Sequence, residues 1–142
     1  MMLTVRGADW NRDREAIQQI RKSVFVEEQG VPEEIEVDGR DGSCTHVLAL
    51  KGVRPVGTAR MQRDGHIGRV SVLKEYRGKG IGRKLLEAMI EQAGCRGLEE
   101  VYLNSQVQAA SFYEKTDFQK TGTVFLEANM PHIKMTRVLK TV

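Results

Sequence analysis

The clearest hydrophobic pattern in the chain lies between residues 67 and 93. A strand-like apolar run is followed there by a charged connector, a glycine-rich turn and a helical repeat. The helical stripe comprises Ile81, Leu85, Leu86, Met89, Ile90 and Ala93. One face of this helix is therefore predicted to be buried. Gly78, Gly80 and Gly82 then fall at the N-terminus of the helix.

The other elements are predicted from the same kind of spacing. Strands are predicted at residues 2–5, 45–50, 56–63, 66–73, 101–104, 118–123 and 133–139. A helix capped by Asp9 or Asn11 is predicted to end near Phe25. Ser105–Gln108 matches a capping box, which predicts that another helix begins there. The dipeptide Asp64-Gly65 predicts a two-residue type I′ hairpin turn.

The order of these elements, βαβββαβαββ, is typical of an α/β layer fold in which helices cover a mixed sheet. A helix separates the strands at 66–73 and 101–104, so these strands are predicted to be parallel. With its 142 residues the chain is expected to form one domain, 1–142. Residues 25–38 read as a long acidic loop with one helical turn. Its carboxylates would attract an amine; the alternative is a solvated acidic surface.

Composition and charge exclude several classes of protein. The 40% hydrophobic and 29% charged residues indicate a folded rather than a disordered chain. A net charge of +3 suits an acidic ligand but is too small and scattered for a nucleic-acid partner. Cys44 and Cys95 lack metal-ligand spacing, so we expect a reduced chain with no metal. We find no signal-peptide core and no apolar run of membrane-spanning length, which predicts a cytoplasmic protein without a membrane partner.

The glycine-rich turn has the features of an anion site. Unpaired backbone N–H groups and the helix dipole favour an anion at a helix N-terminus, and glycines let the main chain approach it. Arg77, Lys79 and Arg83 add positive charge. A P-loop is excluded because Leu73 stands five residues before Gly78 and no Ser or Thr follows Lys79. A dinucleotide fingerprint is excluded because the third glycine comes one residue early.

The remaining pattern, Arg77-x-x-Gly80-x-Gly82 between a strand and a helix, resembles the pyrophosphate loop of the GNAT acetyltransferases. That loop reads Gln/Arg-x-x-Gly-x-Gly/Ala. Residues 70–82 resemble the central motif of the family. Residues 104–118 resemble its second motif, Asn-x-x-A-x-x-FYEK-x-GF, although Asp117 stands where the family usually has glycine. The alternative is a glycine turn used only for packing.

The resemblance extends over nearly the whole chain. Residues 24–32, 38–46 and 130–132 are similar to the small ElaA/YjcF-like branch of the family. The resemblance implies a GNAT-like α/β fold, with a mixed, mostly antiparallel sheet of about six or seven strands that is splayed in the middle and flanked by helices. It also implies acetyl-CoA as the acetyl donor and a primary amine of a small molecule or peptide as the acceptor.

The resemblance assigns roles to individual residues. The positions implied to bind acetyl-CoA are Val70, Val72, Arg77, Gly78, Lys79, Gly80, Ile81, Gly82, Arg83 and Asn104. The backbone N–H of Val72 would stabilise the oxyanion that forms when the amine attacks the thioester. Tyr113 matches the general acid that protonates the leaving thiolate. The alternatives are that Tyr113 only packs, with its hydroxyl bonded to the backbone, and that Asn104 caps the following helix.

The attacking amine must be neutral, and a lysine-like amine has a pKa of about 10.4, so a base is needed. Candidates are Glu28, His132 and a water relay, with His46 and His66 as weaker choices. Glu28 and His132 are also candidate contacts for the acceptor. The sequence does not identify that acceptor.

Two other functions keep part of this pattern. A non-catalytic acyl-CoA-binding or sensor module would need Arg77, Gly80 and Gly82 but not Tyr113. A nucleic-acid-binding protein would use the basic residues around the glycine turn as a phosphate-binding patch. Neither cysteine lies in a recognisable nucleophile setting, which favours direct transfer over a covalent intermediate. Homodimers are common in such families, so a homodimer is one state that the resemblance allows.

Overall fold

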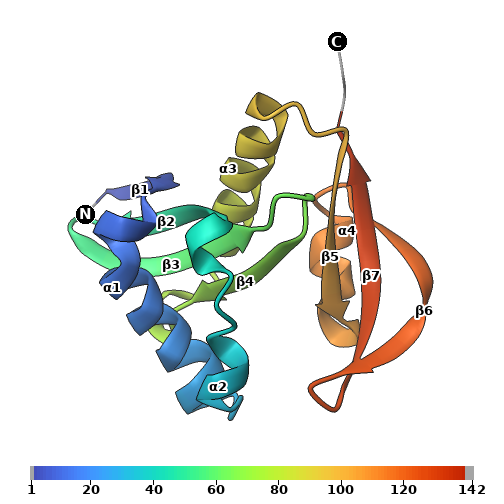
Figure 1. Ribbon diagram of the computed structural model, residues 1–142, viewed down its shortest axis with the longest axis horizontal. Helices are drawn as coiled ribbons and strands as arrows, with labels where there is room; N and C mark the ends of the chain where they lie inside the picture. Colours follow the sequence, from blue (N-terminus) through green and yellow to red (C-terminus); the bar gives the residue numbers. More distant parts are fainter. Residues whose placement is uncertain (1, 140–142) are drawn as a thin grey trace.

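Seven strands form two antiparallel sheets in the computed structural model, which describes residues 2–139 (Figure 1). The first sheet has the order β1-β2-β3-β4, with β1 at Leu3–Ala8, β2 at Thr45–Lys51, β3 at Arg54–Met61 and β4 at Ile67–Val72. The second has the order β5-β7-β6, with β5 at Glu100–Gln106, β6 at Gln119–Glu127 and β7 at Met130–Val138. The predicted element order is confirmed.

The two sheets meet where β4 and β5 run side by side in parallel. A single isolated bridge pairs His66 with Tyr102, and the Tyr102 N–H donates to the Gly65 carbonyl oxygen at 3.0 Å. The rings of His66 and Tyr102 stack with their centroids 4.7 Å apart. Beyond this point β4 and β5 form no further bridge in the described chain, so the predicted parallel relation and the splay in the middle of the sheet are both confirmed.

Helices cover both faces of the first sheet because β2 is apolar on both faces. Its side chains alternate, so that Val47 and Ala49 pack into one core cluster while Leu48 packs into another. Helix α3 (Ile81–Cys95) fills the first cluster with the predicted stripe, of which Ile90 is only partly buried. Helix α1 (Trp10–Arg21) fills the second cluster with Ile17 and Ile20. The short helix α4 (Ala110–Glu114) lies beside the second sheet (Figure 1).

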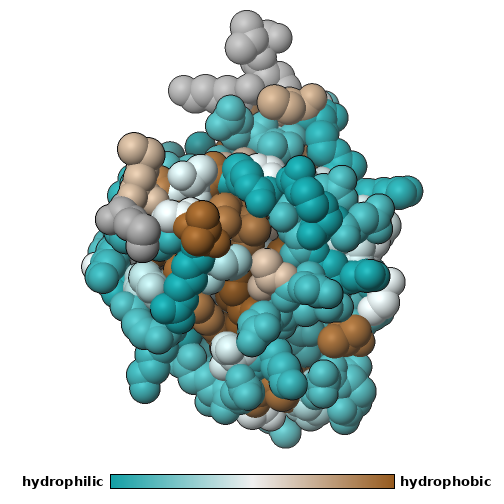
Figure 2. Space-filling model, turned by 90° about the vertical axis from the view of Figure 1, so that its left-hand side faces the viewer, coloured by the Kyte–Doolittle hydropathy of each residue, from teal (hydrophilic) through white to brown (hydrophobic). Residues whose placement is uncertain are grey.

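The N-terminal helix begins as predicted and ends differently. The Asp9 side chain accepts hydrogen bonds from the Asn11 and Arg12 N–H groups and caps α1. The helix does not stop near Phe25 but continues as a π-helical segment over Lys22–Glu28. The acidic loop then contains one short helix, α2 (Glu33–Glu36), as expected. The α1 side of the molecule is mainly hydrophilic, with a hydrophobic hollow near its centre (Figure 2).

Two local predictions are wrong, and turn geometry explains the first. A type I′ turn needs positive φ at both central residues. Gly65 has φ of 95° but Asp64 is not in this region, and a hydrogen bond from Gly65 N–H to Gln62 O closes a longer loop. The two-residue turn of this kind lies instead in the β6–β7 hairpin, where Ala128 and Asn129 have φ of 51° and 62°.

The predicted capping box at Ser105–Gln108 does not start a helix. Strand β5 continues to Gln106, because Ser105 and Gln106 pair with Ile133 and His132 of β7. The chain turns through a 3₁₀ segment, and α4 begins only at Ala110. Cross-strand pairing therefore overrides the local capping signal. No helix within residues 2–139 is long and apolar enough to span a membrane.

Candidate active site

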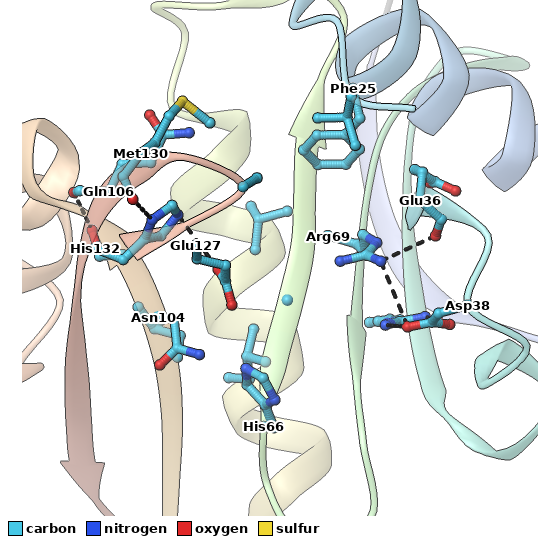
Figure 3. A pocket seen from close by; sticks show the side chains of 18 of the residues that line it. Phe25, Glu36, Asp38, His66, Arg69, Asn104, Gln106, Glu127, Met130 and His132 are labelled. Carbon is cyan, nitrogen blue, oxygen red and sulfur yellow. Dashed lines mark hydrogen bonds and ion pairs between the residues drawn. The ribbon is translucent and has the colours of Figure 1, made fainter. Parts of the chain in front are cut away.

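A cavity of about 650 Å³ opens where the two sheets diverge. One wall comes from β4 and from the segment between Phe25 and Arg40, and the other comes from β5 and the β6–β7 hairpin (Figure 3). Several of the side chains singled out in the sequence line it, among them Val70, Asn104, Tyr113 and His132. Residues from five separate stretches of sequence therefore meet in one hollow.

The backbone of β4 is distorted beside this cavity. Thr58 of β3 pairs with Ser71 and Arg60 pairs with Gly68, so Ala59 faces two residues of β4 instead of one. This extra residue is a β-bulge, and it re-aims the strand locally. The strand is regular again after the bulge, and a 3₁₀ segment at Lys74–Tyr76 connects its end to the glycine loop.

The N–H group of Val72 points away from β3. The next N–H along the chain, that of Leu73, donates to Val56 O on β3 at 2.9 Å. Backbone groups of successive residues in a strand point to opposite sides, so the Val72 N–H points toward the side on which β5 diverges. The Val72 carbonyl oxygen on the same side accepts a hydrogen bond of 2.9 Å from Arg77 Nε.

The glycine loop forms the N-terminus of α3, as predicted. Gly78 and Gly80 have φ of 78° and 81°, and Gly80 is the N-cap residue of this 15-residue helix. A Cβ atom placed on either glycine would meet no atom within 4 Å, so this backbone borders open space. A Cβ on Gly82 would lie 4.0 Å from Val72, which shows that the loop and the end of β4 are adjacent. The arrangement suits an anion.

Carboxylates hold two of the cations around this loop. Arg77 donates to Glu28 through two hydrogen bonds, of 2.5 and 2.7 Å, and this pairing lowers the pKa of Glu28 and raises that of Arg77. Arg83 bonds to Glu87 at 3.1 Å. The Lys79 ammonium lies 5.8 Å from the centre of the Tyr76 ring. Glu28 borders a second hollow beside α1 and does not line the main cavity.

Tyr113 lies on α4 with its ring at the cavity. Phe112 and Phe118 contact this ring edge-on, with centroid distances of 5.0 and 6.1 Å. Burial raises the pKa of the Tyr113 hydroxyl, which therefore stays protonated at neutral pH. The purely structural alternative requires a hydrogen bond from this hydroxyl to the backbone. Within residues 2–139 the hydroxyl makes no such bond.

The β6–β7 hairpin places His132 on the opposite wall from β4 (Figure 3). Its Nδ1 lies 2.7 Å from the Met130 carbonyl oxygen, so Nδ1 carries the proton in the neutral ring. The other nitrogen, Nε2, then holds the lone pair and lies 3.5 Å from a carboxylate oxygen of Glu127. The imidazole is buried, and only 6% of the residue is exposed.

The other polar candidates take different positions. Asn104 lies on β5 and borders the cavity, and it does not cap the following helix, whose N-cap residue is Ala109. His66 also borders the cavity, and burial lowers its pKa. His46 stacks on Trp10 and lies 2.9 Å from Asp41 O, outside the cavity. Its pKa is lowered, again mainly by burial.

A buried ionic cluster supports one wall, and sequence reasoning missed it. Arg21 bonds to Glu36 at 2.5 Å and to Asp41 at 2.6 Å. Arg60 bonds to Asp38 at 2.5 Å and to the same Asp41 oxygen at 3.0 Å. Arg21 is 2% exposed and Arg60 is 3% exposed. The sequence contained one signal of this cluster. Arg21 and Arg60 each stand among apolar residues, one in a predicted helix and one in a predicted strand.

This cluster changes the meaning of the acidic loop. Glu36 and Asp38 border the cavity, but both bind arginines of their own chain. Hydrogen bonding to Arg60 is the main cause that holds the pKa of Asp38 well below its usual range. The carboxylates therefore anchor the loop on α1 and β3 instead of facing the cavity as free anions. Within residues 2–139, no group of three His, Cys, Asp or Glu side chains is placed to hold a metal ion.

Comparison with known proteins agrees with this geometry. The model of the acetyltransferase (GNAT) domain family matches residues 12–139. The chain therefore belongs to the GNAT acetyltransferase family.

The relatives fit the ElaA/YjcF-like branch of that family. The uncharacterized N-acetyltransferase YjcF of Bacillus subtilis (strain 168) is 36% identical over 120 residues, covering 82% of this chain and 86% of YjcF. Protein ElaA of Escherichia coli (strain K12) is 32% identical over 130 residues, covering 86% and 85%. The crystal structure of E. coli ElaA matches with a TM-score of 0.85 at 30% identity, covering 96% of this chain and 99% of ElaA.

Proposed function

We propose that this protein is an N-acetyltransferase that moves the acetyl group of acetyl-CoA directly to a primary amine of a small molecule or peptide. One observation carries the proposal. The glycine loop at the N-terminus of α3 borders the end of β4, and β4 leads from there into the cavity that Tyr113 and His132 line. An extended ligand fits this arrangement if its anionic end lies at the glycine loop and its reactive end lies in the cavity.

The residues present fit the two ends of acetyl-CoA. The loop from Gly78 to Gly82 offers unpaired first-turn N–H groups and open space to a diphosphate. Val70, Val72 and Asn104 border the divergence of β4 and β5, where a pantetheine arm would pair with backbone groups. A solved aminoglycoside 6′-N-acetyltransferase complexed with coenzyme A shares this fold, with a TM-score of 0.78 at 16% identity.

Three groups of the protein would take part in the reaction. The Val72 N–H would donate to the thioester oxygen as negative charge develops there. Tyr113 would donate its proton to the departing sulfur, and the burial that keeps its hydroxyl protonated supports this role. His132 would accept a proton from the amine at Nε2, since its Nδ1 proton is held by the Met130 carbonyl. Glu127, 3.5 Å away, would stabilise the resulting imidazolium.

A reducing cytoplasm is the compartment we propose for this reaction, because both cysteines, Cys44 and Cys95, are free thiols. The nucleic-acid reading loses support because Arg77 and Arg83 are bound by Glu28 and Glu87, which reduces the positive charge available to a phosphate backbone.

Thiol release from acetyl-CoA tests the proposal across a panel of amines, polyamines, aminosugars, amino acids and peptides. Acetyl-CoA-dependent acetylation of at least one amine is the expected result. Tight acetyl-CoA binding without turnover on any amine would favour the sensor function instead. Gly80→Asp supplies the control for the cofactor loop, because a carboxylate at the helix N-cap repels phosphate. Unchanged acetyl-CoA affinity in that variant would show that the diphosphate binds elsewhere.

A further inference from the structure

Arg69 has an unusual backbone conformation inside a strand. It lies in the bulge of β4 and has φ of 54°, in the left-handed region that favours glycine. A long charged side chain at such a position is strained, and strained residues cluster at binding and catalytic sites. Arg69 also lines the main cavity, together with the neighbouring residues of β4.

The guanidinium of Arg69 is only partly satisfied. Its Nη2 donates to the carbonyl oxygens of Ile35 and Glu36, at 3.3 and 3.0 Å. Its Nε is buried and has no hydrogen-bond partner within the described residues. A buried polar group without a partner is costly, and an arginine fork matches the geometry of a carboxylate. The vacant donor therefore favours a ligand that brings an oxygen acceptor.

The charge of Arg69 is also poorly balanced. The nearest carboxylate, that of Asp38, lies 3.6 Å away and is already bound by Arg60 through two hydrogen bonds. Burial, together with the nearby charges of Arg60 and Arg21, lowers the pKa of Arg69. The other two arginines of this cluster each bind two carboxylates, whereas Arg69 relies on backbone carbonyls. A bound anion would correct this imbalance.

The opposite wall of the cavity carries groups that suit an amine, whereas Arg69 suits a carboxylate. Glu127 and His132 line the cavity from the β6–β7 hairpin, whereas Arg69 lines it from β4 and extends toward Glu36 and Asp38 (Figure 3). We propose that Arg69 binds a carboxylate of the acceptor, so that the acceptor is an amino acid or a similar aminocarboxylate whose amine lies toward His132. This inference rests on the proposed acetyl transfer. A monoanionic carboxylate fits better than a phosphate dianion, because Glu36, Asp38 and Glu127 also border the cavity.

Matched pairs of acceptors test the inference. The value of kcat/KM is measured for amino acids and for their carboxamides with saturating acetyl-CoA. The α-amine of a carboxamide is less basic and so more often neutral, which biases the comparison against the proposal. We expect the wild-type protein to prefer the free carboxylate at least about tenfold, since a site built around a polar group rejects analogues that leave it unpaired.

Two variants at Arg69 and one control locate the preference. Arg69→Gly removes the guanidinium and relieves the backbone strain, so it is expected to fold, and it should abolish the preference for the carboxylate. Arg69→Lys keeps the charge without the fork and should retain only part of the preference. Arg40→Gln removes another cation that borders the same cavity and should leave the preference intact. Equal use of acids and amides by the wild type, or an equal loss on both in Arg69→Gly, would overturn the inference.

Equilibrium binding separates this inference from the proposed function. Binding of amino acids and carboxamides is measured by calorimetry without acetyl-CoA, in the wild type and in Arg69→Gly. If no amine is acetylated but amino acids bind only the wild type, the transfer proposal fails while the carboxylate site stands. If amines are acetylated without discrimination and amino acids bind both proteins equally, the carboxylate site fails while the transfer proposal stands.

Discussion

Arg77 binds Glu28 through both of its terminal nitrogens, although the two residues lie 49 positions apart in the chain. The same arginine donates from Nε to Val72 O, so it links the end of the π-helical segment, the end of β4 and the glycine loop. The carboxylate of Glu28 therefore occupies the guanidinium that, in the proposed function, would bind a phosphate of acetyl-CoA. Glu28 would then compete with the cofactor for Arg77.

Glu28→Gln is expected to strengthen acetyl-CoA binding by about two- to fivefold, because it removes a negative charge that competes with the diphosphate for Arg77. Isothermal titration calorimetry measures the dissociation constant. Glu27→Gln provides the control, since the neighbouring Glu27 is also exposed. Weaker binding in Glu28→Gln would instead indicate that the pair holds the loop in its binding conformation.

Tyr113→Phe is expected to lower kcat by about tenfold or more while the dissociation constant of acetyl-CoA stays nearly constant, because the hydroxyl would act only on the leaving sulfur. Because burial raises the pKa of the Tyr113 hydroxyl above its ordinary value, the tyrosine itself should cause no loss of activity at neutral and mildly alkaline pH. Steady-state kinetics with a fixed amine measures both effects. Tyr102→Phe is the control, since it keeps the backbone bridge and the ring that stacks on His66 and removes only a hydroxyl that bonds to Asp64. An active Tyr113→Phe would remove this residue from the mechanism.

Asp117→Gly is expected to raise the free energy of unfolding by about 0.5–1 kcal/mol, because Asp117 has φ of 68°, where glycine carries no Cβ penalty. The same geometry suits the glycine that the family motif has at this position. Urea denaturation measures the change. Asp117→Ala should destabilise the protein, since alanine keeps the Cβ atom and loses the polar side chain. Destabilisation by glycine as well would mean that the Asp117 side chain has a stabilising partner in solution.

Arg21→Gln is expected to destabilise the protein by about 3–5 kcal/mol, because it leaves Glu36 and Asp41 as buried carboxylates with a lost partner. Arg12→Gln is the control, because Arg12 is exposed and its partner Asp13 still binds Arg6, so its loss should cost less than about 1 kcal/mol. Denaturation at neutral pH measures both. Equal effects of the two substitutions would contradict a structural role for the buried cluster.

The same cluster predicts how stability depends on pH. The folded-state pKa values of Asp38 and Asp41 are lowered, so their contribution is complete above the unfolded value of about 4. It is lost as the pH falls from that value through the folded-state pKa values. Urea denaturation at several pH values should therefore show a steep fall in unfolding free energy below about pH 4. A flat profile between pH 5 and 2 would contradict this account.

Local periodicity and glycine spacing predicted helix α3, the glycine loop and the order of the elements along the chain, because these features depend on residues that are close in sequence. The Ser105–Gln108 capping box misled because β7 pairs with β5 up to Gln106, whose partner His132 lies 26 residues further along the chain. The type I′ turn was assigned to Asp64-Gly65, whereas Ala128 and Asn129 adopt it without a glycine. In both cases tertiary contacts overrode the local sequence preference.

The candidate site was predicted unevenly for a similar reason. The cofactor loop is contiguous in sequence, so its spacing was readable. The cavity wall formed by β4 and the segment from Phe25 to Arg40 depends on three arginines, Arg21, Arg60 and Arg69. These come together only through the pairing of β3 with β4 and the packing of α1. Glu28 was a reasonable acceptor candidate by composition, but its bond to Arg77 depends on contacts across 49 residues.

The single bridge between His66 and Tyr102 has a mechanical consequence. Two sheets joined at one backbone contact can change their relative angle without breaking a ladder of hydrogen bonds. A small rotation about that contact displaces the distant tip of the β6–β7 hairpin more than it displaces the strands nearby. In the proposed transferase, a change in this backbone contact is therefore expected to alter the width of the cavity without touching the acceptor.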